Sequence, residues 1–291
     1  MPTIRRHFLT AFKFLWILGI LGATARYLFS NRATVLSQIG SISLQQYLLF
    51  GIFLGLAKVL LADSMRRSLR EVGESVSWRN AYYIYTVSDL SKYIPGGIWG
   101  IVGRMSAFSM SGIDLKRGAR SLGIEHAWLI LSSVFIGVML VPFFQIQALS
   151  TGGLFVVVSV LSFFVWMLCL ILVNVFFKIG RFHAKLGAYI VSSQTAIALF
   201  FGLSVGVLMR GPGDMTVPLA CVGAFALARA AGYVSFFAPA GIGVREFVFV
   251  TLLASHYPAA QLLVISGLYR LLTLVFELGV ACVLIGARSL R

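Results

Sequence analysis

The segment from Ala81 to Arg104, AYYIYTVSDLSKYIPGGIWGIVGR, is apolar enough to enter a membrane but carries Pro95-Gly96-Gly97 near its middle. A membrane-spanning helix needs about 20 mainly apolar residues, and a proline followed by two glycines opposes a continuous helix. Non-helical backbone at membrane depth must be surrounded by protein or water, because hydrocarbon leaves its N–H and C=O groups unpaired. The segment therefore predicts a broken membrane element that borders a cavity.

The composition of the whole chain excludes a water-soluble fold. Of its 291 residues 59% are hydrophobic and 11% are charged, and the mean hydropathy is +0.94, whereas soluble domains carry roughly 25% charged residues. The three cysteines lie singly within apolar runs, so neither a disulfide framework nor a zinc site is expected. We expect one all-α membrane domain over residues 1–291. Its uninterrupted candidate spans are residues 12–29, 44–62, 121–143, 153–177, 188–208, 217–237 and 259–286.

The net charge of +15 indicates how these spans are oriented. Lysine and arginine collect in the cytoplasmic loops of membrane proteins, and here they collect in loops 63–80, 105–120 and 178–187. If the first two loops share a side, residues 81–104 must enter and leave by one face, as a re-entrant hairpin. With residues 241–256 as a short outward crossing, the chain makes about eight crossings and both termini are cytoplasmic, as in a prokaryotic cytoplasmic membrane. No nucleic-acid partner is expected, because the cations form no continuous basic face.

A second apolar stretch, residues 238–256, is interrupted in a similar way at Pro239-Ala240-Gly241-Ile242-Gly243. Both breaks share the order aromatic, apolar, proline, small, glycine and isoleucine, and an arginine follows each, at Arg104 and Arg245. Paired interruptions in the two halves of a transporter mark its binding site. We therefore consider an inverted repeat with halves at about 1–143 and 153–291, with chance similarity over six positions as the alternative.

Charged residues inside the spans are candidates for function, because each costs a few kcal/mol to insert. In the C-terminal half these are Arg229, Arg245, Glu246, Arg270 and Glu277. Arg270 and Glu277 lie about 10 Å apart on one helix face, which suits two groups that line one cavity. The three arginines outnumber the two glutamates, so an anionic ligand would supply the missing partner, and arginine suits phosphate. The alternative is that these charges only pair across helices to hold the bundle together.

The N-terminal half contributes Arg104 and Glu125. Two roles are possible for Glu125. It either interacts with Ser121 in the first turn of its helix or offsets the charge of Arg120, or else it lines the cavity. Lys58 is expected to extend to the membrane interface, and Asp89 and Lys92 lie at i,i+3 on one helix face. An interfacial aromatic belt is expected from Trp78, Tyr82, Tyr83, Tyr85, Tyr93 and Trp99.

Several of these motifs together resemble the membrane region of the lysylphosphatidylglycerol synthase/flippase family. They are Ser91 to Trp99 with Gly103-Arg104, Glu125, Pro239 to Glu246, and Arg270 with Glu277. The resemblance implies a polytopic domain that moves a polar-headed lipid, phospholipid or polyprenyl- or glycolipid, between leaflets. The aminoacyltransferase domain of the full-length enzymes is not in this sequence, so we expect neither aminoacyl transfer nor a cofactor.

These observations lead to a lipid translocator as the first hypothesis, with Pro95, Gly96, Gly97, Pro239, Gly241 and Gly243 forming its central break. Arg104, Arg229, Arg245 and Arg270 would receive a lipid phosphate, and Glu246 and Glu277 would tune those cations or bind a cationic headgroup. The alternative is a non-transporting membrane partner of a glycosyltransferase or lipid-modifying enzyme. A membrane-embedded transferase is disfavoured, because no general base or metal pair stands out in the sequence.

Overall fold

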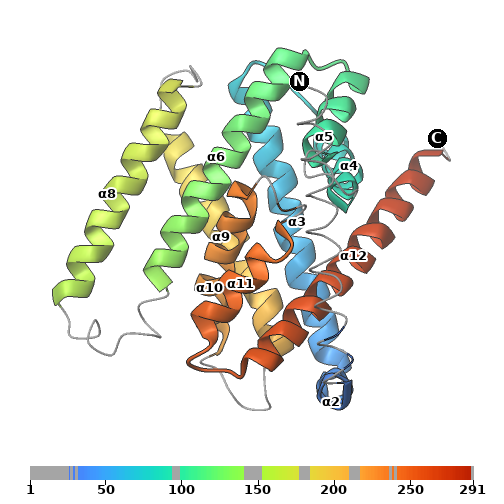
Figure 1. The fold of residues 1–291 in the computed structure, drawn as a ribbon. Helices are drawn as coiled ribbons and strands as arrows, with labels where there is room; N and C mark the ends of the chain where they lie inside the picture. Colours follow the sequence, from blue (N-terminus) through green and yellow to red (C-terminus); the bar gives the residue numbers. More distant parts are fainter. Residues whose placement is uncertain are drawn as a thin grey trace, which may run out of the picture.

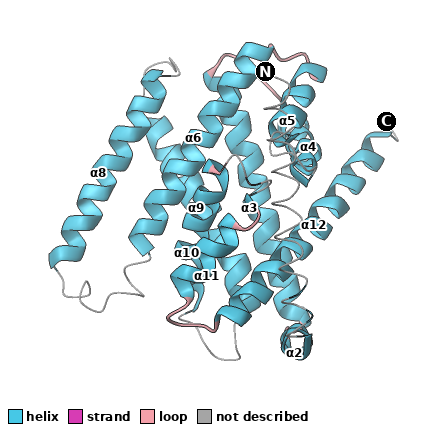
Figure 2. Ribbon diagram, in the orientation of Figure 1, coloured by secondary structure: helices cyan, strands magenta, loops and turns pink. Residues whose placement is uncertain are grey.

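The computed structural model describes residues 26, 29, 32–93, 99–140, 153–176, 184–209, 217–235, 238 and 241–289. Every regular element within these ranges is helical, as expected from the composition (Figure 2). In chain order they are α2 (Arg32–Ser41), α3 (Leu44–Glu71), α4 (Trp78–Asp89), the short 3-10 helix η1 (Leu90–Tyr93), α5 (Trp99–Met110), α6 (Leu115–Leu140), α8 (Gly153–Phe176), α9 (Ala184–Met209), α10 (Val217–Val234), α11 (Val244–Leu253) and α12 (Ala259–Ser289).

The helices follow the predicted spans closely. Four stretches are long and apolar enough to cross a membrane, at Leu44–Glu71, Leu115–Leu140, Lys185–Met209 and Ala259–Arg288, and two shorter apolar stretches lie at Val160–Val173 and Ala220–Val234. Helix α3 begins at a capping box between Ser43 and Gln46 and continues nine residues beyond the predicted span. Helix α2 was not predicted. The first predicted span, residues 12–29, lies outside the described residues except for Arg26 and Phe29.

Helices α3, α6, α9 and α10 pack together as the centre of the bundle, while α8 packs on the outer side of α6 (Figure 1). Glycine allows the closest of these approaches. A Cβ placed on Gly202 of α9 would lie 2.3 Å from the Cα of Val222 on α10, and one on Gly137 of α6 would lie 2.3 Å from the Cγ of Leu227. Small residues at such crossings are typical of membrane helices, which associate through van der Waals packing rather than the hydrophobic effect.

The first broken segment folds back on itself, as predicted for a re-entrant hairpin. Helix α5 packs against both α4 and η1. A Cβ on Gly103 of α5 would lie 2.1 Å from the Oγ of Ser91, so only glycine permits this contact. The turn between the two arms, with Pro95, Gly96 and Gly97, lies outside the described residues.

The second break separates α10 from α11, which pack against each other and run in opposite directions (Figure 1). Gly241 and Gly243 have φ of +70° and +85°, a region that residues with a Cβ rarely adopt. Helix α11 has 10 residues, which correspond to about 15 Å, so it covers about half of a hydrocarbon core roughly 30 Å thick. The chain thus returns to the side from which α10 started, as the predicted topology requires.

The basic ends of the long helices gather at one end of the bundle. The C-terminal ends of α3 and α12 and the N-terminal ends of α6 and α9 all lie at the top of Figure 1. They carry Arg66, Arg67, Arg70, Lys116, Arg117, Arg120, Lys185 and Arg288. This arrangement matches the grouping of basic loops that the sequence predicts.

Candidate functional site

A cavity of about 420 Å³ lies between the two broken segments. Its walls come from α3, α4, η1, α5, α6, α9, α10, α11 and α12, so segments far apart in the sequence meet around it. Residues that flank the first break (Tyr93, Gly100) and the second (Ala238, Gly241) line the same space. The charged residues of the lining are Lys58, Asp89, Lys92, Arg104, Glu125, Arg229, Arg245, Glu246, Arg270 and Glu277.

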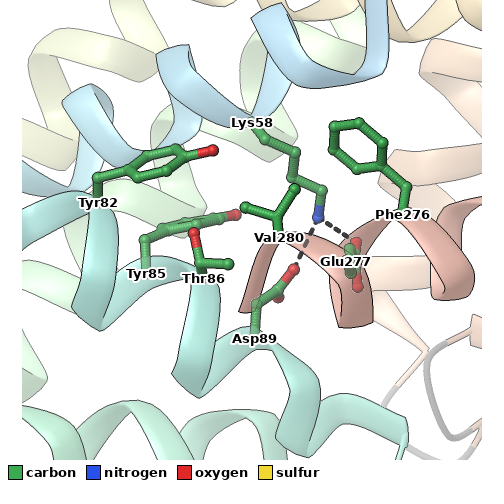
Figure 3. A pocket seen from close by; sticks show the side chains of 8 residues that line it. All are labelled: Lys58, Tyr82, Tyr85, Thr86, Asp89, Phe276, Glu277 and Val280. Carbon is green, nitrogen blue, oxygen red and sulfur yellow. Dashed lines mark hydrogen bonds and ion pairs between the residues drawn. The ribbon is translucent and has the colours of Figure 1, made fainter. Parts of the chain in front are cut away.

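Four of these charges form a neutral cluster of two lysines and two carboxylates at one side of the cavity. Figure 3 shows three of them, Lys58, Asp89 and Glu277. Lys58 Nζ donates to Asp89 at 2.7 Å and also pairs with Glu277. Lys92 Nζ lies 2.8 Å from an oxygen of each of the same two carboxylates. The cluster joins α3, α4, η1 and α12. The predicted Asp89–Lys92 pair is confirmed, but the interfacial position predicted for Lys58 is wrong, because its side chain is buried between two anions.

Arg104 and Glu125 form a second buried pair, with Nη1 and Oε2 3.5 Å apart. Arg104 Nε also donates to Ser88 Oγ at 2.7 Å, and its guanidinium lies 4.2 Å from the Tyr85 ring centroid. Of the two readings for Glu125, the structure favours the cavity, because α6 begins at Leu115 and places Glu125 beyond its first turn. Tyr85 is buried beside this pair, so its assignment to an interfacial belt is also wrong.

Glu246 and Arg270 form the third pair and tie α11 to α12. The other oxygen of Glu246 accepts from the backbone N–H of Gly243 at 2.7 Å and so caps the start of α11. Arg270 Nη2 donates to the carbonyl of Gly241 at 3.4 Å. Arg270 and Glu277 line one cavity, as their spacing predicts, but each pairs with a different partner.

Two cavity arginines have no carboxylate within ion-pair distance among the described residues. Arg229 is 3% exposed, and neither of its terminal nitrogens has a hydrogen-bond partner within the part of the chain that the structure describes. The buried Nε of Arg245 likewise has no hydrogen-bond partner among the residues described. Their guanidinium carbons lie near aromatic rings, Arg229 3.8 Å from the Phe201 centroid and Arg245 5.2 Å from that of Tyr233. The surplus of arginine that the sequence predicts in this half is therefore present in the fold.

All seven charged residues singled out from the sequence line this one cavity. Gly241 lines it and Gly243 precedes α11, whereas Pro95, Gly96, Gly97 and Pro239 fall outside the described residues. The sequence reading missed Lys58, Tyr85, Phe201 and Tyr233 as lining residues. Lys58 lies four residues before the end of the predicted span 44–62, so its place in the sequence did not distinguish a buried lysine from an interfacial one. In the structure α3 continues to Glu71, which places Lys58 in the interior of the helix.

The charges that line the cavity favour an anionic ligand. Six cations and four carboxylates line it, which leaves a formal excess of two positive charges. Within the described ranges, no group of three or more His, Cys, Asp or Glu side chains could hold a metal ion. Uncompensated cations in a low dielectric are costly, so binding of an anion there is favourable.

The sequence of this chain was also compared with known proteins. Residues 10–281 match the family described as the lysylphosphatidylglycerol synthase TM region. Curated proteins give no match. The family match includes both broken segments and every charged residue of the cavity. This chain belongs to the lysylphosphatidylglycerol synthase membrane-region family, whose members are integral membrane domains tied to the handling of lipids.

Proposed function

We propose that this protein moves a membrane lipid with a phosphate-bearing headgroup between the two leaflets, without altering the lipid chemically. The observation that carries this proposal is the cationic cavity between two interrupted membrane segments. Interrupted segments that meet at mid-membrane form the substrate sites of many transporters. Membership of a lipid-handling family supports lipid as the substrate class.

The size and chemistry of the cavity support a role in binding the headgroup. Ligand pockets typically enclose about 300–1,000 Å³, and this cavity of about 420 Å³ suits a polar headgroup while the acyl chains stay in the bilayer. The charged lining replaces the water that a phosphate loses when it leaves the membrane surface. Without such a lining, transfer of the ion into low dielectric costs tens of kcal/mol by Born solvation.

The arrangement of the helices supports movement of the headgroup through the protein. The α4–α5 pair comes from the N-terminal half of the chain and the α10–α11 pair from the C-terminal half, and both line the cavity. Three groups of ion pairs connect these helices to α3, α6 and α12. We propose that rocking of the two halves exposes the cavity to each leaflet in turn. The basic helix ends would face the cytoplasm of a prokaryotic cell.

Reconstitution into liposomes tests this function directly. Proteoliposomes that contain a fluorescent lipid labelled on an acyl chain are treated with a membrane-impermeant reductant, which reports lipid that has reached the outer leaflet. Wild-type protein is expected to expose lipid from the inner leaflet, and Arg245→Ala and Arg270→Ala are expected to abolish this exposure. Arg117→Ala is the matched control, because Arg117 is exposed and pairs with Glu74 outside the cavity.

Wild-type rates in both cavity variants would refute the proposal. Mass spectrometry of the recovered lipid checks the second part of the claim, which requires the lipid to be unchanged. A product of altered mass would indicate a membrane-embedded transferase instead.

A further inference from the structure

The pairing of the charged side chains in the cavity limits which lipid headgroups can bind there. Asp89 and Glu277 are each shared by two lysines, Glu125 pairs with Arg104, and Glu246 pairs with Arg270. Each carboxylate of the lining therefore lies within ion-pair distance of a cation, although Glu125 Oε2 and Glu277 Oε2 accept no hydrogen bond among the described residues. A headgroup amine would have to share a carboxylate with a cation of the protein, whereas a headgroup anion would meet Arg229 and Arg245, which have no carboxylate within ion-pair distance in the described ranges.

Arg229 is placed as a binding group rather than as a structural one. It lies on α10, is 3% exposed, and lines the cavity with two terminal nitrogens that have no partner in the described ranges. Its guanidinium carbon lies 3.8 Å from the ring centroid of Phe201. A cation–π contact offsets part of the cost of burying the charge, but it supplies no acceptor for the N–H donors.

Two glycines leave room for the Arg245 side chain, Gly232 on α10 and Gly241 in the connection before α11. A Cβ at Gly232 would lie 2.3 Å from Arg245 Nε, and a Cβ at Gly241 would lie 2.8 Å from the same atom. Arg229 and Arg245 flank one ring, since their guanidinium carbons lie 5.9 and 5.2 Å from the Tyr233 centroid. Two donors of this kind, fixed in position around one aromatic ring, form a built site.

We infer that Arg229 and Arg245 together bind one doubly charged phosphate, so that the lipid carried by this protein ends in a phosphomonoester or a diphosphate. A phosphomonoester carries about −1.5 to −2 charges at pH 7, which matches the two uncompensated cations. A phosphodiester headgroup carries one charge on its phosphate and leaves one arginine unneutralised. An aminoacylated headgroup adds a positive charge that the cavity does not match. This inference rests on the proposed function and specifies its substrate class.

The test compares two lipids that differ in one charge. Binding of dioctanoyl phosphatidate and of dioctanoyl phosphatidylmethanol to the purified protein in detergent is measured by calorimetry at pH 8. The methyl ester removes one negative charge and adds one carbon. The wild type is expected to bind phosphatidate more tightly by about tenfold or more, because hydrogen bonds to charged groups contribute about 1.5–3 kcal/mol each. Equal affinities would overturn the inference.

Variants connect this preference to the two arginines. In Arg229→Gln and Arg245→Gln the phosphatidate affinity is expected to fall more than that of the methyl ester, so that their ratio approaches one. Arg229→Lys and Arg245→Lys keep the charge and are expected to retain a preference for phosphatidate. Arg117→Gln is the control and should keep the wild-type ratio. If both glutamine variants kept the wild-type ratio of phosphatidate to phosphatidylmethanol affinity, the dianion would bind at another site and the inference would be overturned.

Inorganic phosphate distinguishes a lipid site from a site for the free ion. It has the same charge without acyl chains, and it is expected to compete with phosphatidate only weakly. Competition at equal affinity would overturn the assignment to a lipid.

The liposome assay separates this inference from the proposed function. If phosphatidylmethanol is translocated and binds with the same affinity as phosphatidate, the dianion preference fails and translocation stands. If phosphatidate binds with the expected preference but no lipid is translocated, translocation fails and the site stands.

Discussion

Gly232 of α10 and Arg245 of α11 are in such close contact that a Cβ at position 232 would lie 2.6 Å from Arg245 Cγ and 2.3 Å from its Nε. A methyl group at position 232 must therefore displace the arginine. We expect Gly232→Ala to reduce phosphatidate affinity and lipid translocation by about tenfold or more, because hydrogen bonds from the displaced guanidinium are lost. The measurements are the calorimetric titration and the liposome assay.

Gly267→Ala is the matched control for this change. A Cβ at Gly267 of α12 would meet nothing within 4 Å, so the variant should bind and translocate lipid as the wild type does. Full activity in Gly232→Ala would mean that the position of Arg245 does not matter.

Arg229 should lower the stability of the ligand-free protein, because it is a buried cation without a counter-charge. Arg229→Met keeps most of the side-chain volume and removes the charge. We expect it to raise the free energy of unfolding in detergent by about 1–3 kcal/mol and to abolish translocation. Denaturant unfolding without added lipid measures the first effect.

Arg104→Met provides the contrast, because Arg104 pairs with Glu125 and its loss leaves that carboxylate buried alone. Its free energy of unfolding should fall by about 3–5 kcal/mol. If both variants were destabilised equally, Arg229 would have a partner that neutralises it.

The lysine–carboxylate cluster should behave as one unit. Lys58→Met leaves Asp89 and Glu277 with Lys92 as their shared cation, and we expect a loss of about 3 kcal/mol in stability. Adding Glu277→Gln should restore part of this loss, since it removes the carboxylate left without a second cation. The double-mutant cycle is expected to give a coupling energy of about 0.5–3 kcal/mol, and strict additivity would contradict the cluster.

The crossing of α9 and α10 depends on Gly202. A Cβ there would meet the backbone of Val222 at 2.3 Å, and a backbone atom cannot move aside as a flexible side chain can. We expect Gly202→Ala to destabilise the protein by about 1–3 kcal/mol, as measured by denaturant unfolding in detergent. Gly51→Ala on α3 is the control, since a Cβ at position 51 would meet open space and alanine favours the helix.

Much of the fold follows from the sequence because membrane helices have a strong one-dimensional signal. The predicted spans at 153–177 and 188–208 differ from α8 and α9 by at most four residues at either end. The hairpin over residues 81–104 follows from charge counting alone, because two basic loops must share a side. The composition also predicts that at least one arginine near the second break would lack a carboxylate partner.

The choice of partners did not follow from the sequence. Glu277 is seven residues from Arg270 but pairs with Lys58 and Lys92, which come from α3 and η1. Only the packing of four elements decides that arrangement. Lys58 was misread for a related reason: interfacial placement is the rule for lysine in isolated spans, and a buried lysine requires carboxylates from other helices that the local sequence does not reveal.

The short α11 bears on the electric field across the bilayer. A helix of about 15 Å that ends at a polar cavity leaves only part of the hydrocarbon thickness as insulator, so the voltage drop is concentrated over a shorter path. One elementary charge that crosses the whole potential gains about 2.3 kcal/mol per 100 mV, and a doubly charged headgroup gains about twice that. Under the proposed function, transfer of such a lipid is electrogenic, and an inside-negative membrane potential favours its outward movement.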